Sequence, residues 1–248
     1  MLTTIVLVLA GLAAGALNAL AGGGTFLTFP ALVWAGVPPI SANATATFAA
    51  LPGYLGSAWA YRSNIDVQGR PSLIRLIGVS IIGGLVGALL LLVTSAELFS
   101  GVVPWLLVFA TAAFAAGPFV VKRQMASGRS LSEMAALGVI ALVSVYGGYF
   151  NGGLGIMLLA AFGIIGMTDL HRMNGLKNLL SAVLSVVSVA TYTAAGLIDW
   201  SSLLTLGIAC AIGGYLGAIL AKRIRNTAAL RAFIILVGIV MSIIFFVR

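Results

Sequence analysis

Long apolar stretches separated by short polar links run along the whole chain. An α-helix of about 20 apolar residues crosses a hydrocarbon core of about 30 Å. The pattern therefore predicts an all-α, polytopic membrane protein with helical segments at roughly 2–20, 24–37, 40–61, 71–94, 99–121, 131–150, 153–168, 173–196, 201–221 and 228–247. The two short segments, 24–37 and 153–168, are marginal for a full crossing and fit a broken or re-entrant helix.

The composition supports this class of protein. Only 7% of the 248 residues are charged and 61% are hydrophobic, whereas a soluble domain has about a quarter of its residues charged. The net charge of +8 is better explained by basic cytoplasmic loops than by nucleic-acid binding. No basic residue precedes the first apolar segment, so we expect a permanent helix there and not a cleaved signal peptide. The single Cys210 cannot form an internal disulfide and is expected to be a buried packing residue.

The chain contains an internal repeat of about 130 residues. The sequence IGGLVGALLL at 82–91 recurs as IGGYLGAILA at 212–221, and the glycines at 22–24 correspond to the cluster at 151–155. Duplicated halves are common in transporters. We expect one integral membrane domain made of a first repeat, 1–125, and a second repeat, 126–248.

The charges of the links predict how the two repeats are oriented. Basic residues mark cytoplasmic loops, and an odd number of crossings in each half places all the basic links on one face. The opposite face then carries Glu97, Asp199 and both chain termini. This arrangement makes the halves inverted repeats, with the N- and C-termini on the non-cytoplasmic side. The basic links contain Arg62, Arg70 and Arg75, then Lys122, Arg123 and Arg129, and finally Lys222, Arg223 and Arg225.

Glycine-rich interruptions mark a candidate binding site. Inverted-repeat transporters place substrate near the midplane, where helices are broken. Glycine lets a ligand approach backbone N–H groups, and a helix N-terminus favours anions. A tight turn with close helix packing explains the glycines equally well. The candidate residues are Gly22, Gly23, Gly24 and Thr25 in the first half, and Asn151, Gly152 and Gly153 in the second.

Polar residues form a stripe along the third segment of each half. In the second half, steps of three or four residues put them on one helix face, and the first half repeats that face. We interpret the two stripes as a hydrated path, although hydrogen bonding between helices also uses such residues. The stripes consist of Asn43, Thr47, Ser57 and Tyr61, and of Asn174, Asn178, Ser181, Ser185, Ser188 and Tyr192.

Lys177 lies inside an apolar segment, beside Asn174 and Asn178, and its counterpart in the first half is Ala46. An intramembrane charge is costly and indicates function, so Lys177 is a candidate anion ligand. Snorkelling to the nearby cytoplasmic surface is an equally good explanation. His171 and Arg172 are expected at the interface.

The acidic residues limit the mechanism. All of them lie in loops or at helix ends, so no carboxylate is available at mid-membrane for a proton relay. An anion leaving a negative cell interior gains about 2.3 kcal/mol per charge per 100 mV, which favours export without a coupling ion. The acids are Asp66, Glu97, Glu133, Asp169 and Asp199.

Two stretches resemble a known family. Residues 18–53, NALAGGGTFLTFPALVWAGVPPISANATATFAALPG, and 148–181, GYFNGGLGIMLLAAFGIIGMTDLHRMNGLKNLLS, are similar to the two signatures of the TauE/SafE family of bacterial sulfite-exporter-like permeases. The resemblance implies a permease of the bacterial plasma (inner) membrane for sulfite, sulfoacetate or thiosulfate. The second cluster departs from a glycine triplet, which weakens exact two-fold equivalence. The signature positions here are Gly22, Gly23, Gly24, Pro30 and Asn43, with Gly152, Gly153, Gly155, Asn174 and Lys177.

Other classes of function fit less well. No catalytic motif, metal-ligand cluster or phosphate loop is present, so we expect no enzyme, cofactor or metal site. A passive anion channel or a non-transporting assembly subunit remains as an alternative. The expected partners are a small anionic substrate and membrane lipid, without nucleic acid. The patterns Gly83-x-x-x-Gly87 and Gly213-x-x-x-Gly217 fit close helix packing, either within the fold or in a homodimer.

Overall fold

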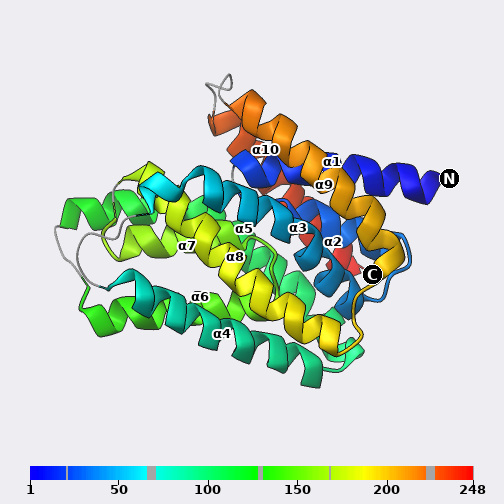
Figure 1. The fold of residues 1–248 in the computed structure, drawn as a ribbon, viewed down its shortest axis with the longest axis horizontal. Helices are drawn as coiled ribbons and strands as arrows, with labels where there is room; N and C mark the ends of the chain where they lie inside the picture. Colours follow the sequence, from blue (N-terminus) through cyan, green and yellow to red (C-terminus); the bar gives the residue numbers. More distant parts are fainter. Residues whose placement is uncertain (21, 66–70, 128–130, 168, 222–226, 248) are drawn as a thin grey trace.

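The computed structural model describes residues 1–20, 22–65, 71–127, 131–167, 169–221 and 227–247. Within these ranges the chain forms ten α-helices and one short 3₁₀ helix, and no strand (Figure 1). The helices are α1 Leu2–Leu20, α2 Thr25–Trp34, α3 Pro39–Ala60, α4 Leu73–Val93, α5 Ala96–Ser127, α6 Glu133–Tyr149, α7 Leu154–Ile164, α8 Leu170–Ala194, α9 Trp200–Ala221 and α10 Thr227–Val247, with η1 at Arg62–Asn64.

The helices confirm the all-α, multi-pass architecture. Five of the described helices contain a span long and apolar enough to cross a membrane. These spans are Leu2–Ala19, Leu73–Val93, Ala96–Gly117, Arg172–Ala194 and Trp200–Gly217. The helix α2 has 10 residues and α7 has 11. At 1.5 Å per residue each covers only about 15 Å, half of a hydrocarbon core.

Several expected boundaries were wrong in detail. The helix α5 begins before Glu97 and continues past Lys122 and Arg123, so these residues are helical and not in links. Arg75 likewise lies in the first turn of α4. Hydropathy detects only the apolar part of a helix, whereas polar ends can extend the same backbone hydrogen bonding. The boundary at 125/126 falls within the last turn of α5.

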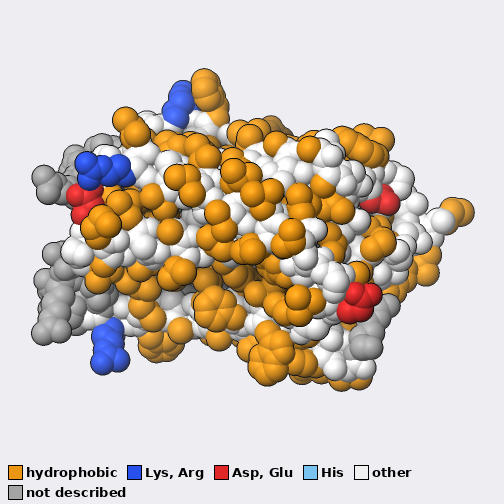
Figure 2. Space-filling view, turned by 90° about the horizontal axis from the view of Figure 1, so that it is seen from below, with side chains coloured by type: hydrophobic (Ala, Val, Ile, Leu, Met, Phe, Trp, Pro, Cys, Tyr) orange, Lys and Arg blue, Asp and Glu red, His pale blue; other side chains and the backbone are white. Residues whose placement is uncertain are grey.

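Some predicted residues fall outside the described parts of the chain. The backbone of Asp66, Arg70, Arg129, Lys222, Arg223 and Arg225 is not described, and neither is the side chain of His171. Among the residues that are described, Lys and Arg side chains gather toward one end of the molecule in Figure 2. Both chain ends lie toward the opposite end of the long axis in Figure 1.

Glycines allow two helix pairs to pack closely. The helix α4 packs along α6, and α9 packs along α1. A Cβ on Gly87 would collide with the Val145 carbonyl of α6, and one on Gly217 would lie 2.5 Å from the Cα of Ala16 in α1. Both small-residue patterns therefore serve packing within the chain. Cys210 lies in the same α1–α9 contact, 5% exposed, as expected of a packing residue.

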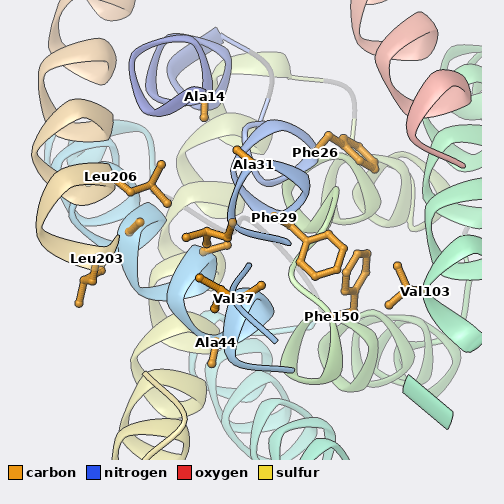
Figure 3. Packing of buried hydrophobic residues seen from close by; sticks show 14 of the residues in the cluster. Ala14, Phe26, Phe29, Ala31, Val37, Ala44, Val103, Phe150, Leu203 and Leu206 are labelled. Atoms are coloured by element: carbon orange, nitrogen blue, oxygen red, sulfur yellow. The ribbon is translucent and has the colours of Figure 1, made fainter. Parts of the chain in front are cut away.

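The short helix α2 lies at the centre of the main apolar cluster (Figure 3). Phe29 is fully buried, and its ring centroid lies 5.5 Å from that of Phe150 in an edge-to-face arrangement. Phe150 directly follows α6 and precedes the second glycine cluster. This packing fixes α2 against the region where α6 ends and α7 begins, which brings the two chain breaks into one neighbourhood.

Candidate functional site

The two glycine-rich breaks meet inside the protein. Gly22, between α1 and α2, has φ +81°, and a Cβ there would lie 3.2 Å from the Cα of Gly155. A Cβ on Gly155, in the first turn of α7, would lie 3.1 Å from the Cα of Gly22. Only glycine permits this approach, because other residues rarely adopt such a φ and have no room for a side chain. Gly153 also has a positive φ, +75°.

Lys177 reaches this meeting point from α8. Its side chain is 1% exposed, and its Nζ lies 3.6 Å from the position a Cβ on Gly22 would take. The Cδ of Lys177 likewise lies 3.3 Å from a Cβ position on Gly155. The ammonium therefore sits between the two breaks and does not extend to the surface, which settles the choice left open between burial and snorkelling.

Within the described residues, the ammonium of Lys177 has one hydrogen-bond partner, which is neutral. Nζ donates a hydrogen bond to Oδ1 of Asn174, one helical turn earlier, at 3.2 Å. In the described part of the chain no carboxylate lies within ion-pair distance of it. A buried charge is costly unless it is paired. Lys177 thus provides a buried positive charge that a bound anion would neutralise.

Several buried hydroxyl groups near the breaks and along α8 lack a protein partner. The oxygens of Thr25, at the start of α2, and Ser181, one turn after Lys177, are both buried without a hydrogen bond. Asn178 is 4% exposed, and its amide makes no hydrogen bond with the described part of the chain. Thr28, Thr111 and Ser188 have similar unpaired hydroxyls. Buried polar groups are normally satisfied, so unpaired ones indicate a place for water or a ligand.

Backbone N–H groups add further donors at the two breaks. The N–H of Gly24 is used, because it donates to Oδ1 of Asn18 at 2.8 Å. The N–H groups of Gly23, Thr25 and Gly155 have no acceptor in the described residues. First-turn N–H groups carry the positive end of the helix dipole. Together with Lys177 they create a region that favours negative charge.

Asn151 joins three elements. Its Nδ2 donates to Oγ of Ser185 on α8 at 3.3 Å, and its Oδ1 accepts from the hydroxyl of Tyr54 on α3 at 3.5 Å. This bridge positions the second break between α3 and α8. Both amide atoms of Asn151 are engaged, so its role in this structure is to hold the site together.

Asn43 and Thr47 lie in the same α3 stripe but contact a different part of the protein. Nδ2 of Asn43 donates to the carbonyl of Tyr149, at the end of α6, at 3.0 Å. The hydroxyl of Thr47 donates to the carbonyl of Asn43 at 2.8 Å. The Oδ1 of Asn43 is buried and unpaired. The structure therefore brings Gly22, Gly155, Asn174 and Lys177 together, whereas the hydrogen bonds described for Asn43 do not involve Lys177.

Some supporting residues were not singled out from the sequence. Asn18 holds the first glycine cluster, and the hydroxyl of Tyr146 donates to the Gly152 carbonyl at 2.6 Å in the second. Tyr192, expected in the polar stripe, donates to the carbonyl of Gly148. The available signal for Asn18 was an isolated amide in an otherwise apolar segment, four residues before the glycines.

Two ion pairs are described elsewhere in the chain. Arg172 pairs with Asp169 at 3.4 Å, and Arg75 pairs with Glu133. Both pairs are partly exposed, which agrees with the interfacial position expected for Arg172. Within the described residues, no group of His, Cys, Asp or Glu side chains has the arrangement of a metal site.

Comparison with known proteins identifies a family of membrane proteins that matches nearly the whole chain. A model of the family described as "Sulfite exporter TauE/SafE" matches residues 7–245. A probable membrane transporter protein, YfcA of Escherichia coli K12, is 27% identical over 96% of this chain and 87% of its own length. Probable membrane transporter proteins of Sinorhizobium and Haemophilus influenzae are 24% and 25% identical, covering 96% and 94% of this chain and 90% of each relative. No solved structure matches the chain closely enough to support a relationship.

Proposed function

The chain belongs to the TauE/SafE family, and from that premise we propose that it carries a small sulfur-containing anion across the membrane. Membership places it among membrane transporters and not among enzymes. The proposed substrates are compounds such as sulfite, sulfoacetate or thiosulfate, and the proposed direction is export. The observation that carries the proposal is the buried Lys177 ammonium, placed between two glycine breaks with no carboxylate partner among the described residues.

The proposed site combines charge with directed hydrogen bonds. Lys177 neutralises the anion, while the N–H groups of Gly23, Thr25 and Gly155 and the hydroxyls of Thr25 and Ser181 replace its hydration shell. These donors are already in place, so binding requires little reorganisation. In this account Asn43, Thr47, Asn151, Gly152 and Asn178 line or support the path that leads to Lys177.

We further propose that the two halves are inverted repeats. Helix packing supports this, because most contacts between helices have a counterpart when the halves are exchanged: α1 with α9 corresponds to α6 with α4, and α5 with α7 to α10 with α2. The helix ends correspond as well. The N–H of Val37 bonds the Leu32 carbonyl, and the N–H of Met167 bonds the Phe162 carbonyl 130 residues later.

Alternating access follows from such a repeat. The substrate would stay near the membrane midplane while one half rocks against the other and exposes it to either face. The proposed repeats are 1–125 and 126–248, with both termini on the non-cytoplasmic side of a bacterial inner membrane. A homodimer, if formed, uses faces other than the two glycine patterns, because these pack within the chain.

Sidedness can be tested with single cysteines in a Cys210→Ala background. Ser63, near the basic end of α3, and Ser95, between α4 and α5, are both exposed. We expect a membrane-impermeant thiol reagent added to intact cells to label Ser95→Cys and to spare Ser63→Cys. Labelling of both, or only of Ser63→Cys, would contradict the proposed orientation.

Transport itself is tested by flux in proteoliposomes. Radiolabelled sulfite, thiosulfate and sulfoacetate are loaded, and release is measured for the parent, Lys177→Gln and Arg172→Gln. We expect saturable release with counterflow, abolished in Lys177→Gln and retained in the control Arg172→Gln, whose side chain is partly exposed and paired with Asp169. Release that does not saturate and shows no counterflow would indicate a channel. Absence of flux for every anion would favour the non-transporting subunit.

A further inference from the structure

The charge of the site limits the charge of its substrate. Among the described residues, Lys177 is the only charged side chain that is fully buried. The helices α3 and α7, which pack against α8, contain no charged residue. The other neighbours of α8 contribute Arg75 of α4 and Glu133 of α6, which pair with each other at the helix ends, and the exposed Arg62 of η1. The interior around Lys177 thus carries a single uncompensated positive charge.

Several polar groups on α8 and at the two breaks can donate hydrogen bonds. The hydroxyls of Thr25 and Ser181 can donate, as can the N–H groups of Gly23 and Gly155, for which the described residues provide no acceptor. Oxygens of an oxyanion accept hydrogen bonds from all of these groups. The close approach of Gly22 to Gly155, where an added Cβ would lie 3.1–3.2 Å from the facing Cα, confines the surroundings of the ammonium. These observations favour a compact ligand rich in acceptors.

We infer that the site takes one monovalent oxyanion and discriminates against divalent ones. This inference rests on the anion-transport function proposed above. A single negative charge cancels that of Lys177 and leaves the occupied interior neutral. A second negative charge would be buried without a partner, which is costly in a membrane protein. For sulfite, the form that fits is therefore hydrogen sulfite and not the dianion. Thiosulfate and sulfoacetate are both dianions at neutral pH, so among the substrates proposed above this inference favours hydrogen sulfite over these two.

The test compares two tetrahedral sulfur oxyanions of different charge. Methanesulfonate is monovalent and sulfate is divalent at neutral pH, so both are titrated at one pH and ionic strength. Purified protein in nanodiscs is used, and binding is followed by isothermal titration calorimetry. We expect methanesulfonate to bind at least roughly tenfold more tightly than sulfate, because only sulfate adds an unpaired buried charge. Sulfate binding as tight as methanesulfonate binding, or tighter, would overturn the inference.

Variants connect the preference to Lys177. We expect Lys177→Gln to lose methanesulfonate binding at least tenfold, Lys177→Arg to keep the preference for the monovalent anion, and Arg172→Gln to match the parent. If Lys177→Gln does not fold, the parent and Lys177→Arg still decide the question. Competition against labelled sulfite flux gives a second readout, in which methanesulfonate should inhibit more strongly than sulfate.

The outcomes separate this inference from the proposed function. Equal inhibition by sulfate and methanesulfonate, with flux still dependent on Lys177, would refute the charge selection and leave anion transport standing. Flux independent of Lys177 would refute both the site and the selection that depends on it.

Discussion

Replacing a glycine by alanine at the first break tests the site, and the same replacement at a second glycine with a positive φ controls for backbone strain. Gly22 and Gly36 both have a positive φ, +81° and +90°. A Cβ on Gly36 meets no atom within 4 Å, whereas one on Gly22 would lie 3.2 Å from Gly155 Cα and 3.6 Å from Lys177 Nζ. The variants Gly22→Ala and Gly36→Ala therefore share the backbone strain of a positive φ, but only Gly22→Ala adds a steric contact at the site.

The expected costs follow from these contacts. A left-handed conformation costs an L-residue about 1–2 kcal/mol, so Gly36→Ala should lose about that much stability. Overpacking adds about 1–3 kcal/mol, which brings the expected loss for Gly22→Ala to about 2–5 kcal/mol. For a chain of this size about 2–4 °C of melting temperature corresponds to each kcal/mol. The tight contact with Gly155 should push the two breaks apart beside the Lys177 ammonium, so anion flux should be abolished in Gly22→Ala alone.

The assay combines thermal unfolding in detergent with flux in proteoliposomes for the two variants and the parent. Flux is compared at a temperature where all three proteins remain folded. If Gly22→Ala transports as well as Gly36→Ala, the contact between the first break and Lys177 has no role in function, and the reasoning about the site is refuted.

Three further predictions concern packing, pH and the bridge. Gly213→Ala should lose about 1–3 kcal/mol of stability, because its Cβ would lie 2.7 Å from Leu12 Cα. A Cβ on Gly207, on the same helix, meets only Leu203 Cδ1 at 3.8 Å, so Gly207→Ala should gain up to about 1 kcal/mol. Equal melting temperatures of the two variants would contradict this. The Ser202 N–H and the Ser201 hydroxyl, both bonded to the Asp199 carboxylate at 2.8 Å, hold the pKa of Asp199 below its usual value. These hydrogen bonds cap the start of α9, and their stabilisation is present at neutral pH and lost as the pH falls through the lowered pKa of Asp199. Asp199→Ala should therefore cost about 0.5–2 kcal/mol of stability at neutral pH and less in acid. A loss of stability that does not depend on pH would contradict this role of Asp199 as a helix cap. Asn151→Ala should cost about 1 kcal/mol of stability by removing two hydrogen bonds. Combining it with Tyr54→Phe should cost little more, because the hydrogen bond between Tyr54 and Asn151 is already lost. If the losses of the two single variants add in the double variant, Tyr54 and Asn151 act independently.

Much of the fold could be predicted from the sequence, because hydrophobic length is the main determinant of a membrane helix. The expected segment 2–20 corresponds to α1, Leu2–Leu20, and the short segment 153–168 to α7, Leu154–Ile164. The extension of α5 to Ser127 could not be predicted in this way. Its last turns carry Lys122 and Arg123, and apolar patterning gives no information on a polar helix end.

The candidate site was predictable in its components but not in its contacts. Glycine clustering and the charge of Lys177 were visible in the sequence. The position of the ammonium was not, since a lysine near a helix end can extend outward or inward with the same local pattern. Only packing of α8 against the breaks determines that it points inward. The engagement of both amide atoms of Asn151 likewise depends on Tyr54 and Ser185, far away in sequence.

The central claim is that an anion binds at Lys177, and ligand-induced stabilisation tests it most directly. A ligand at 100 times its dissociation constant stabilises a protein by about 2.7 kcal/mol. The melting temperature is therefore measured with and without excess sulfite, thiosulfate or sulfoacetate for the parent, Lys177→Gln and Arg172→Gln. We predict that at least one of these anions stabilises the parent and Arg172→Gln but not Lys177→Gln. Stabilisation of Lys177→Gln equal to that of the parent, or of none of the three proteins, would contradict the account.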